Sequence, residues 1–294
     1  MFIIKNRKIF VIISGILVSL SIASLIVFGL NFGIDFKGGS LLEVEYSTTR
    51  PSQTVIEESI KPLDIGGILV QPIGDNGYSI KSRDINETER ASVMSALGET
   101  ATEKSFTSIG PSVGAELVRK SILSFILVAL GIILWIAYSF RKVSKPVSSW
   151  RYGIIAVVAL IHDVVISAGV FAVISHFTGA EVDTLFVVAI LTVLGLSVSD
   201  TIVVFDRIRE NIRIGTSKLF EETVGKSINQ VYTRSIATSS TVIIVLLALV
   251  FFGPTSTKLF ATVLTVGMFF GTYSSIFLAS PLLVISSNLD KAKK

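Results

Sequence analysis

The sequence contains no cysteine, and this absence excludes several classes of site. Without a thiol, a chain has neither a disulfide framework nor a thiolate metal centre. Histidine is almost as scarce, since His162 and His176 are the only two in 294 residues. We find no Ser-His-Asp arrangement, no Walker motif and no zinc-protease motif. The sequence therefore predicts a protein that is not an enzyme and that has no metal site and no cofactor.

Charged residues are also few, at 16% of the chain against 50% hydrophobic residues. Soluble domains usually carry about 25% charged residues. The mean hydropathy of +0.72 is correspondingly high. The net charge of +4 does not indicate nucleic-acid binding, because the basic residues fall in particular short loops. This composition predicts an integral membrane protein that lies in a lipid bilayer and has no nucleic-acid partner.

Apolar runs long enough to cross a bilayer, about 20 residues each, recur along the chain. The first run is too long for the hydrophobic region of a signal peptide, and no small-residue cleavage site follows it before Asn31. We therefore expect it to be a spanning anchor. The six predicted spans are residues 9–30, 118–139, 153–176, 184–205, 235–252 and 258–286.

Basic residues in the connections predict the orientation. They gather at both ends of the chain and in the loops after the second and fourth spans, whereas the opposite short loops hold Glu181, Asp183 and Lys258. Because basic loops stay inside the cell, we expect both termini to be cytoplasmic. Four aromatic residues near these boundaries are expected to form an interfacial belt: Trp135, Tyr138, Trp150 and Tyr152. The basic residues are Lys5, Arg7 and Lys8; Arg141, Lys142, Lys145 and Arg151; Arg207, Arg209, Arg213, Lys218 and Lys226; and Lys291, Lys293 and Lys294.

The segment between the first two spans is long enough to fold outside the membrane. Its pattern reads strand, helix, strand, strand, helix, strand, and Gly74 to Gly77 is typical of a hairpin turn. That order predicts a ferredoxin-like α+β domain. The expected division is residues 1–30 for the N-terminus and first span, 31–117 for the external domain, and 118–294 for spans two to six. Within the last part, 206–234 is predicted to be a cytoplasmic amphipathic loop. Its apolar stripe suits a helix lying on the membrane surface: Phe220, Val224, Ile228 and Val231.

Three ionisable residues lie in or at the edge of apolar spans, where a charge costs roughly 2.5–3.5 kcal/mol on insertion scales. They are Asp163, Asp200 and Arg234. Asp200 and Arg234 come at similar depth from the same membrane face, so we expect them to pair. Thr238 follows Arg234 by one helical turn. A carboxylate that faces an arginine among hydroxyls suits a proton or sodium relay, and it equally suits a permanent structural salt bridge.

His162 and Asp163 are adjacent in the third span. Neighbouring residues on a helix point about 100° apart, and no further histidine or cysteine is near, which disfavours a metal site. The pair is expected to be either a secondary polar site beside the relay or a set of helix-packing hydrogen bonds.

Five motifs in register resemble the SecD/SecF family of protein-export membrane proteins, part of the resistance-nodulation-division superfamily. The segment Asn31 to Gly39, which includes Gly33, Asp35, Gly38 and Gly39, is similar to the signature that opens the family's external domain. Because this glycine-rich segment precedes a strand, a turn at the membrane exit is favoured over phosphate binding. The other motifs are Gly110 to Gly114, His162-Asp163, Leu194 to Asn211, and Ser235 to Ser240.

The resemblance implies a function that the residues alone do not. A SecF-like chain would provide six spans and one external domain, and would pair with SecD. The pair would act with the SecYEG channel and SecA in the bacterial cytoplasmic membrane, using a proton or sodium gradient to draw unfolded preproteins outward. The relay roles would fall on Asp200, Arg234 and Thr238. Two other functions stay open: a homodimeric efflux transporter, and an assembly factor without ion coupling.

Overall fold

The computed structural model describes residues 2–141 and 147–292. Four of the basic residues used to predict orientation lie outside these ranges: Lys142, Lys145, Lys293 and Lys294. The chain divides into two compact units. One comprises Met1–Asn31 with Ser124–Lys294, and the other comprises Phe32–Leu123. Each unit is described by itself.

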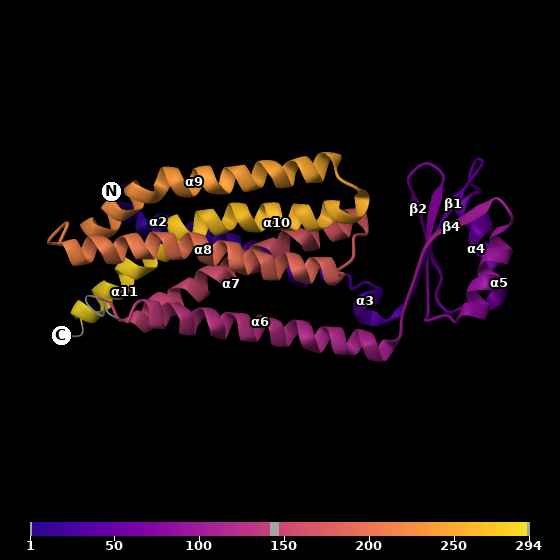
Figure 1. Cartoon of the computed structure of the whole chain (residues 1–294), viewed down its shortest axis with the longest axis horizontal. Helices are drawn as coiled ribbons and strands as arrows, with labels where there is room; N and C mark the ends of the chain where they lie inside the picture. Colours follow the sequence, from indigo (N-terminus) through magenta and orange to yellow (C-terminus); the bar gives the residue numbers. More distant parts are fainter. Residues whose placement is uncertain (1, 142–146, 293–294) are drawn as a thin grey trace. The chain divides into compact units, whose positions relative to one another are not determined.

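Six helical segments are long and apolar enough to cross a membrane, which confirms the predicted fold class (Figure 1). The sixth consists of α10, the π-helix η2 and α11 in succession. Most of the helices belong to the first unit, and α6 extends from the second unit into the first. Their bounds are α1 Phe2–Lys5, α2 Arg7–Phe28, α6 Pro111–Ser139, α7 Ser149–Thr178, α8 Thr184–Ile214, α9 Phe220–Phe252, α10 Thr255–Ser274, η2 Ser275–Ala279 and α11 Ser280–Ala292.

The six spans differ in how much of their surface the chain itself covers. In α7, α8 and the sixth span, 50–61% of the most apolar window is buried, against 6–11% in α2, α6 and α9. The exposed helices are just as apolar as the buried ones, with mean hydropathies of 2.4 to 2.7. Apolar surface of this extent is stable in contact with lipid or with another membrane protein. The outer helices therefore face surroundings that this chain does not supply.

The segment 206–234 differs from the predicted surface loop. The helix α8 runs on to Ile214, and α9 begins at Phe220, so most of this segment is the continuation of two long helices. The stripe expected to rest on the membrane is instead buried in the main core of the helical unit, packed with residues of other helices. Two polar contacts hold it there: Arg7 pairs with Glu221 at 3.1 Å, and Asn211 donates to Ser227 Oγ at 2.8 Å. Apolar partners inside the chain thus replace the membrane surface.

Tyr152 is a second departure from expectation. It is fully buried, and its ring stacks on Phe140 at 5.1 Å and meets Phe205 edge-on at 5.2 Å. It therefore belongs to the core rather than to an interfacial belt. Trp135, Tyr138 and Trp150 are exposed, with about 60% of each surface accessible.

The second unit has the predicted βαββαβ order. Its four strands form an antiparallel sheet in the order β2-β3-β1-β4, and β2 and β3 form the expected hairpin. Figure 1 shows α4 and α5 lying together on one face of that sheet. At the start of α5 the side chains of Asn86 and Glu89 cap each other's backbone N–H groups. The bounds are α3 Ile34–Lys37, β1 Gly39–Tyr46, α4 Gln53–Ile60, η1 Lys61–Leu63, β2 Leu69–Ile73, β3 Gly77–Ser82, α5 Glu87–Leu97 and β4 Ala101–Ile109.

Candidate functional site

Asp200 lies in the middle of α8 and is held by hydroxyl groups alone. It is 8% exposed. Ser239 of α9 donates to its Oδ2 at 3.1 Å, and Thr272 of α10 lies 3.0 Å from the same oxygen and 2.6 Å from Ser239 Oγ. Across the described residues, Oδ1 accepts no hydrogen bond and no cation pairs with either oxygen. The carboxylate therefore has capacity for a proton or a small cation.

Arg234 does not pair with Asp200 in this chain, contrary to expectation. Its side chain is exposed on α9, as is Thr238, whose hydroxyl donates to the Arg234 carbonyl at 2.9 Å. The inward face of α9 is instead occupied by Ser235 and Ser239, both buried. Successive residues on a helix are rotated by about 100°, so Arg234 and Ser235 face different ways. The structure thus brings Asp200 together with Ser239 and leaves Arg234 and Thr238 on an outer face.

His162 and Asp163 form a second polar cluster, and they contact each other although they are adjacent on α7. The Nδ1 atom of His162 lies 2.9 Å from Asp163 Oδ1. Ser197 of α8 and Ser274 of α10 both donate to Oδ2, at 2.5 Å and 2.8 Å. Asp163 is completely buried and His162 is 4% exposed. No group of three or more histidine and carboxylate side chains suited to a metal ion occurs among the described residues.

The two carboxylates are linked through the same pair of helices. Ser197 and Asp200 lie one turn apart on α8, while Thr272 and Ser274 lie two residues apart on α10. These helices approach closely because α10 has glycine where they meet. A Cβ on Gly271 would come within 2.9 Å of Ser197 Cβ. A displacement of α10 against α8 would therefore alter both clusters together.

Sequence reasoning missed four of the side chains that hold these carboxylates and the glycines that let the helices meet. Serine and threonine are common in spans, where they bond to their own helix, so nothing in the pattern sets these apart. Glycine gives no clearer signal, because Gly195 on α8 has open space around it whereas Gly267 and Gly271 on α10 face Val193 and Ser197. The missed residues are Ser197, Ser239, Thr272, Ser274, Gly267 and Gly271.

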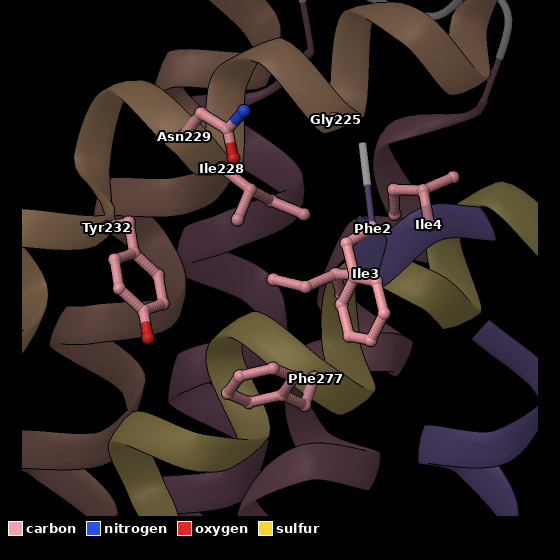
Figure 2. Close-up of a pocket in the computed structure, with 8 residues that line it drawn as sticks. All are labelled: Phe2, Ile3, Ile4, Gly225, Ile228, Asn229, Tyr232 and Phe277. Carbon is pink, nitrogen blue, oxygen red and sulfur yellow. The ribbon is translucent and has the colours of Figure 1, made fainter. Parts of the chain in front are cut away.

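The helical unit has two cavities, and one of them borders the Asp200 cluster. A cavity of about 200 Å³ between α9 and α10 is lined by both hydroxyl partners of Asp200, and by Tyr273 and Phe277. A larger cavity of about 510 Å³ lies at the ends of α1 and α9 (Figure 2). It contains no charged side chain and none of the predicted site residues, so it does not contribute to an ion site. Its lining is Phe2, Ile3, Ile4, Gly225, Ile228, Asn229, Tyr232 and Phe277.

The glycine-rich motif forms a turn that joins the two ends of the second unit. After the single helical turn α3, Gly38 and Gly39 have φ values of +78° and +132°. A Cβ on Gly38 would lie 3.0 Å from the backbone of Pro111, and one on Gly114 would lie 2.9 Å from the Phe36 carbonyl oxygen. The motif beginning with Gly33 and Asp35 therefore packs directly on the Gly110 to Gly114 motif. Both have a structural role at the base of the α+β unit.

These features define a class of protein: a polytopic membrane protein with a ferredoxin-like domain and carboxylates buried among transmembrane helices. Residues 89–288 match the family described as protein export membrane protein SecD/SecF, C-terminal, and residues 23–49 match the SecD/SecF GG motif. The chain belongs to the SecD/SecF family of protein-export membrane proteins.

Relatives of known name align with nearly the whole length of this chain. The protein translocase subunit SecF of Thermobaculum terrenum is 41% identical, over 98% of this chain and 94% of its own length. That of Anaerolinea thermophila is 40% identical, over 96% and 93%. These translocase subunits are not enzymes, in agreement with the prediction from the sequence.

Solved structures of SecDF have the same fold. The translocon-associated SecDF of Thermus thermophilus superposes with a TM-score of 0.78 at 29% identity, covering 97% of this chain. A second, SecDF in the super-membrane-facing form, gives 0.71 at 28% identity over 99% of this chain. The chain spans only 38% and 39% of those two SecDF chains. It therefore corresponds to one part of a larger SecDF assembly.

Proposed function

We propose that this chain is the SecF-like subunit of a SecD-SecF complex that uses a proton or sodium gradient to promote preprotein export. It would act with SecYEG and SecA in the bacterial cytoplasmic membrane, with both termini cytoplasmic. The observation that carries the ion coupling is Asp200: a buried carboxylate in a span, held by hydroxyls through one oxygen, beside a cavity. Intramembrane carboxylates are rare and mark ion pathways.

The gradient supplies enough energy for such a role. One charge that crosses 100 mV releases about 2.3 kcal/mol. At roughly 150 mV a single ion makes about 3.5 kcal/mol available, which shifts a two-state equilibrium several-hundred-fold. That shift is ample to move helices that share the Asp200 hydrogen bonds.

The exposed polar face of α9 supports this proposal, because a partner subunit would cover it. Arg234 and Thr238 lie on that face, and only 11% of the apolar window of α9 is covered by this chain. An arginine exposed in a span is costly against lipid and less so against a polar partner. We therefore infer that SecD covers this face and that Arg234 acts at the subunit interface.

The test is export per assembled complex, measured in vesicles with an imposed gradient. Asp200→Asn keeps the size and hydrogen bonding of the side chain but fixes it neutral, and Arg234→Met removes the exposed charge. Both should abolish gradient-stimulated export while insertion and assembly remain normal. Asp206→Asn is the matched control, because Asp206 is exposed on the same helix and pairs with Arg209. Normal export per complex in Asp200→Asn would rule out the relay and favour an assembly factor without ion coupling.

A further inference from the structure

We propose that the cavity at the ends of α1 and α9 binds one acyl chain of an anionic phospholipid, whose headgroup rests on Lys5 and Lys8 (Figure 2). The cavity lies within the helical unit, and neither Asp163 nor Asp200 lines it. The site requires only that the chain lies in a bilayer, so it does not rest on the proposed export function.

The cavity has the chemistry of a site for a hydrocarbon chain. Its volume of about 510 Å³ is within the usual range of small-molecule sites, roughly 300–1,000 Å³. In Figure 2 the side chains of Ile3 and Ile228 point toward one another from α1 and α9, and Phe277 lies at the bottom of the view. Among the described residues of the lining, the polar side chains are those of Asn229 and Tyr232. A space walled by isoleucine and phenylalanine offers water few partners and takes up apolar molecules instead.

The position of the cavity along the helices matches the boundary between lipid headgroups and acyl chains. Its lining residues 225–232 come just before the apolar part of α9, and residues 2–4 come just before the first span. Phe277, by contrast, lies on η2 within the sixth span. Phe2 is 71% exposed and Tyr232 is 40% exposed, so the cavity opens to its surroundings. An acyl chain can therefore enter from the bilayer while its headgroup stays at the surface.

Basic side chains beside the cavity favour an anionic headgroup. Lys5 follows the lining residue Ile4, and Lys8 lies three residues further on, in the first turn of α2. Both lysines are exposed, and neither forms an ion pair with any residue that the structure describes. Arg7, which lies between them, is already paired with Glu221 at 3.1 Å. Each free lysine near a membrane surface strengthens the binding of anionic lipid about fivefold, and a zwitterionic lipid gains much less.

Native mass spectrometry of the chain, extracted from membranes in a mild detergent, counts the phospholipids that each chain retains. The probes are phosphatidylglycerol and phosphatidylethanolamine with the same acyl chains, which differ in net charge. We expect one retained phosphatidylglycerol, and Lys5→Gln and Lys8→Gln should each weaken its retention about fivefold. Lys218→Gln is the matched control, because Lys218 is exposed in the α8–α9 connection and does not line the cavity. Equal retention of the two lipids, or an equal loss in the control, would overturn the proposal.

Ile3→Trp tests the cavity itself. Ile3 is partly buried in the lining, so an indole ring there would occupy the space of the acyl chain and should abolish retention of phosphatidylglycerol. Ile9→Trp adds the same side chain at an exposed position of α2 and should leave retention unchanged. Undiminished retention in Ile3→Trp would contradict a bound chain at this place.

Cross-linking of the wild-type chain locates the lipid even if Ile3→Trp does not fold. Phosphatidylglycerol with a photoactivatable diazirine in its acyl chain, incorporated into nanodiscs, should cross-link to residues 2–4 and 225–232. Cross-links confined to the exposed faces of α2 and α6 would overturn the proposal. So would a chain that retains no phospholipid, the result expected if a partner subunit fills the cavity with its own side chains.

Discussion

At the scale of single residues, the glycine motif makes a specific prediction for Gly39. Its φ of +132° is strained for any other residue, and a Cβ there would lie 2.7 Å from the Ser82 carbonyl oxygen. Gly39→Ala should therefore destabilise the α+β unit by about 1–3 kcal/mol, the usual cost of a strained backbone position. Thermal unfolding of the purified chain, followed by circular dichroism, measures this change.

Gly67→Ala is the matched control for that experiment. Gly67 is exposed in the same unit, has no positive φ, and has no atom within 4 Å of the position that a Cβ would take. An exposed substitution of this kind usually changes stability by less than about 0.5 kcal/mol. Equal unfolding curves for the two variants would show that the turn at Gly38 and Gly39 is not strained.

The sequence locates the carboxylates that lie buried in the spans, because such side chains are unusual for their surroundings. Asp200 and the His162-Asp163 pair stand out because ionisable groups are rare in apolar spans. The hydroxyls that hold them do not stand out. The expected Asp200–Arg234 pair was wrong for this chain because similar depth fixes only the position along the helix. The rotation of α9 places Ser239 inward and Arg234 outward, and no periodicity in the sequence reveals which face meets α8.

At the scale of helices, the close contact between α8 and α10 leads to a prediction for Gly267. A Cβ on Gly267 would lie 2.2 Å from Val193 Cγ2. The side chain of Val193 on α8 therefore packs directly against the backbone of α10 at Gly267. Gly267→Ala should force them apart and destabilise the helical unit by about 1–3 kcal/mol, as overpacking typically does. The fraction of protein that stays monodisperse after heating in detergent measures this loss of stability.

Gly195→Ala tests whether that loss comes from packing. Gly195 lies on α8 within a few turns of the contact, but it is exposed and has no atom within 4 Å of a Cβ position. The exchange should be neutral or slightly stabilising, since alanine favours a helix by roughly 1 kcal/mol. If Gly195→Ala lost as much folded protein as Gly267→Ala, close approach of α8 and α10 would not be the cause.

Helix number and type were predictable, and helix ends were not. Hydropathy marks where a chain can lie in lipid, so it found all six spans, and the alternating pattern between the first two gave the βαββαβ order. Hydropathy does not mark where a helix stops. The helices α8 and α9 continue past the apolar region because Ile208 on α8 and Phe220 and Val224 on α9 find apolar partners within the chain. A polar stretch with an apolar stripe fits a surface helix and a buried helix equally well, and only packing distinguishes them.

At the scale of the whole molecule, the absence of cysteine permits a clean test of orientation. The basic loops predict that the α+β unit lies outside the cell and that the connection between α8 and α9 lies inside. Asp75 is exposed in the hairpin turn between β2 and β3, and Lys218 is exposed in the α8–α9 connection. Single cysteines at these two positions, Asp75→Cys and Lys218→Cys, would each be the sole thiol in the chain.

A membrane-impermeant maleimide added to intact spheroplasts should label Asp75→Cys fully and Lys218→Cys only after the membrane is permeabilised. The physical reason is the cost of moving Arg and Lys side chains across the bilayer during insertion, which keeps short basic loops on the cytoplasmic side. Denatured samples of both variants, labelled in parallel, control for thiol reactivity. The reverse pattern would place the termini outside. It would also put the α+β unit on the cytoplasmic side, where it could not act on a preprotein that has left the channel, so the proposed export function would fail with it.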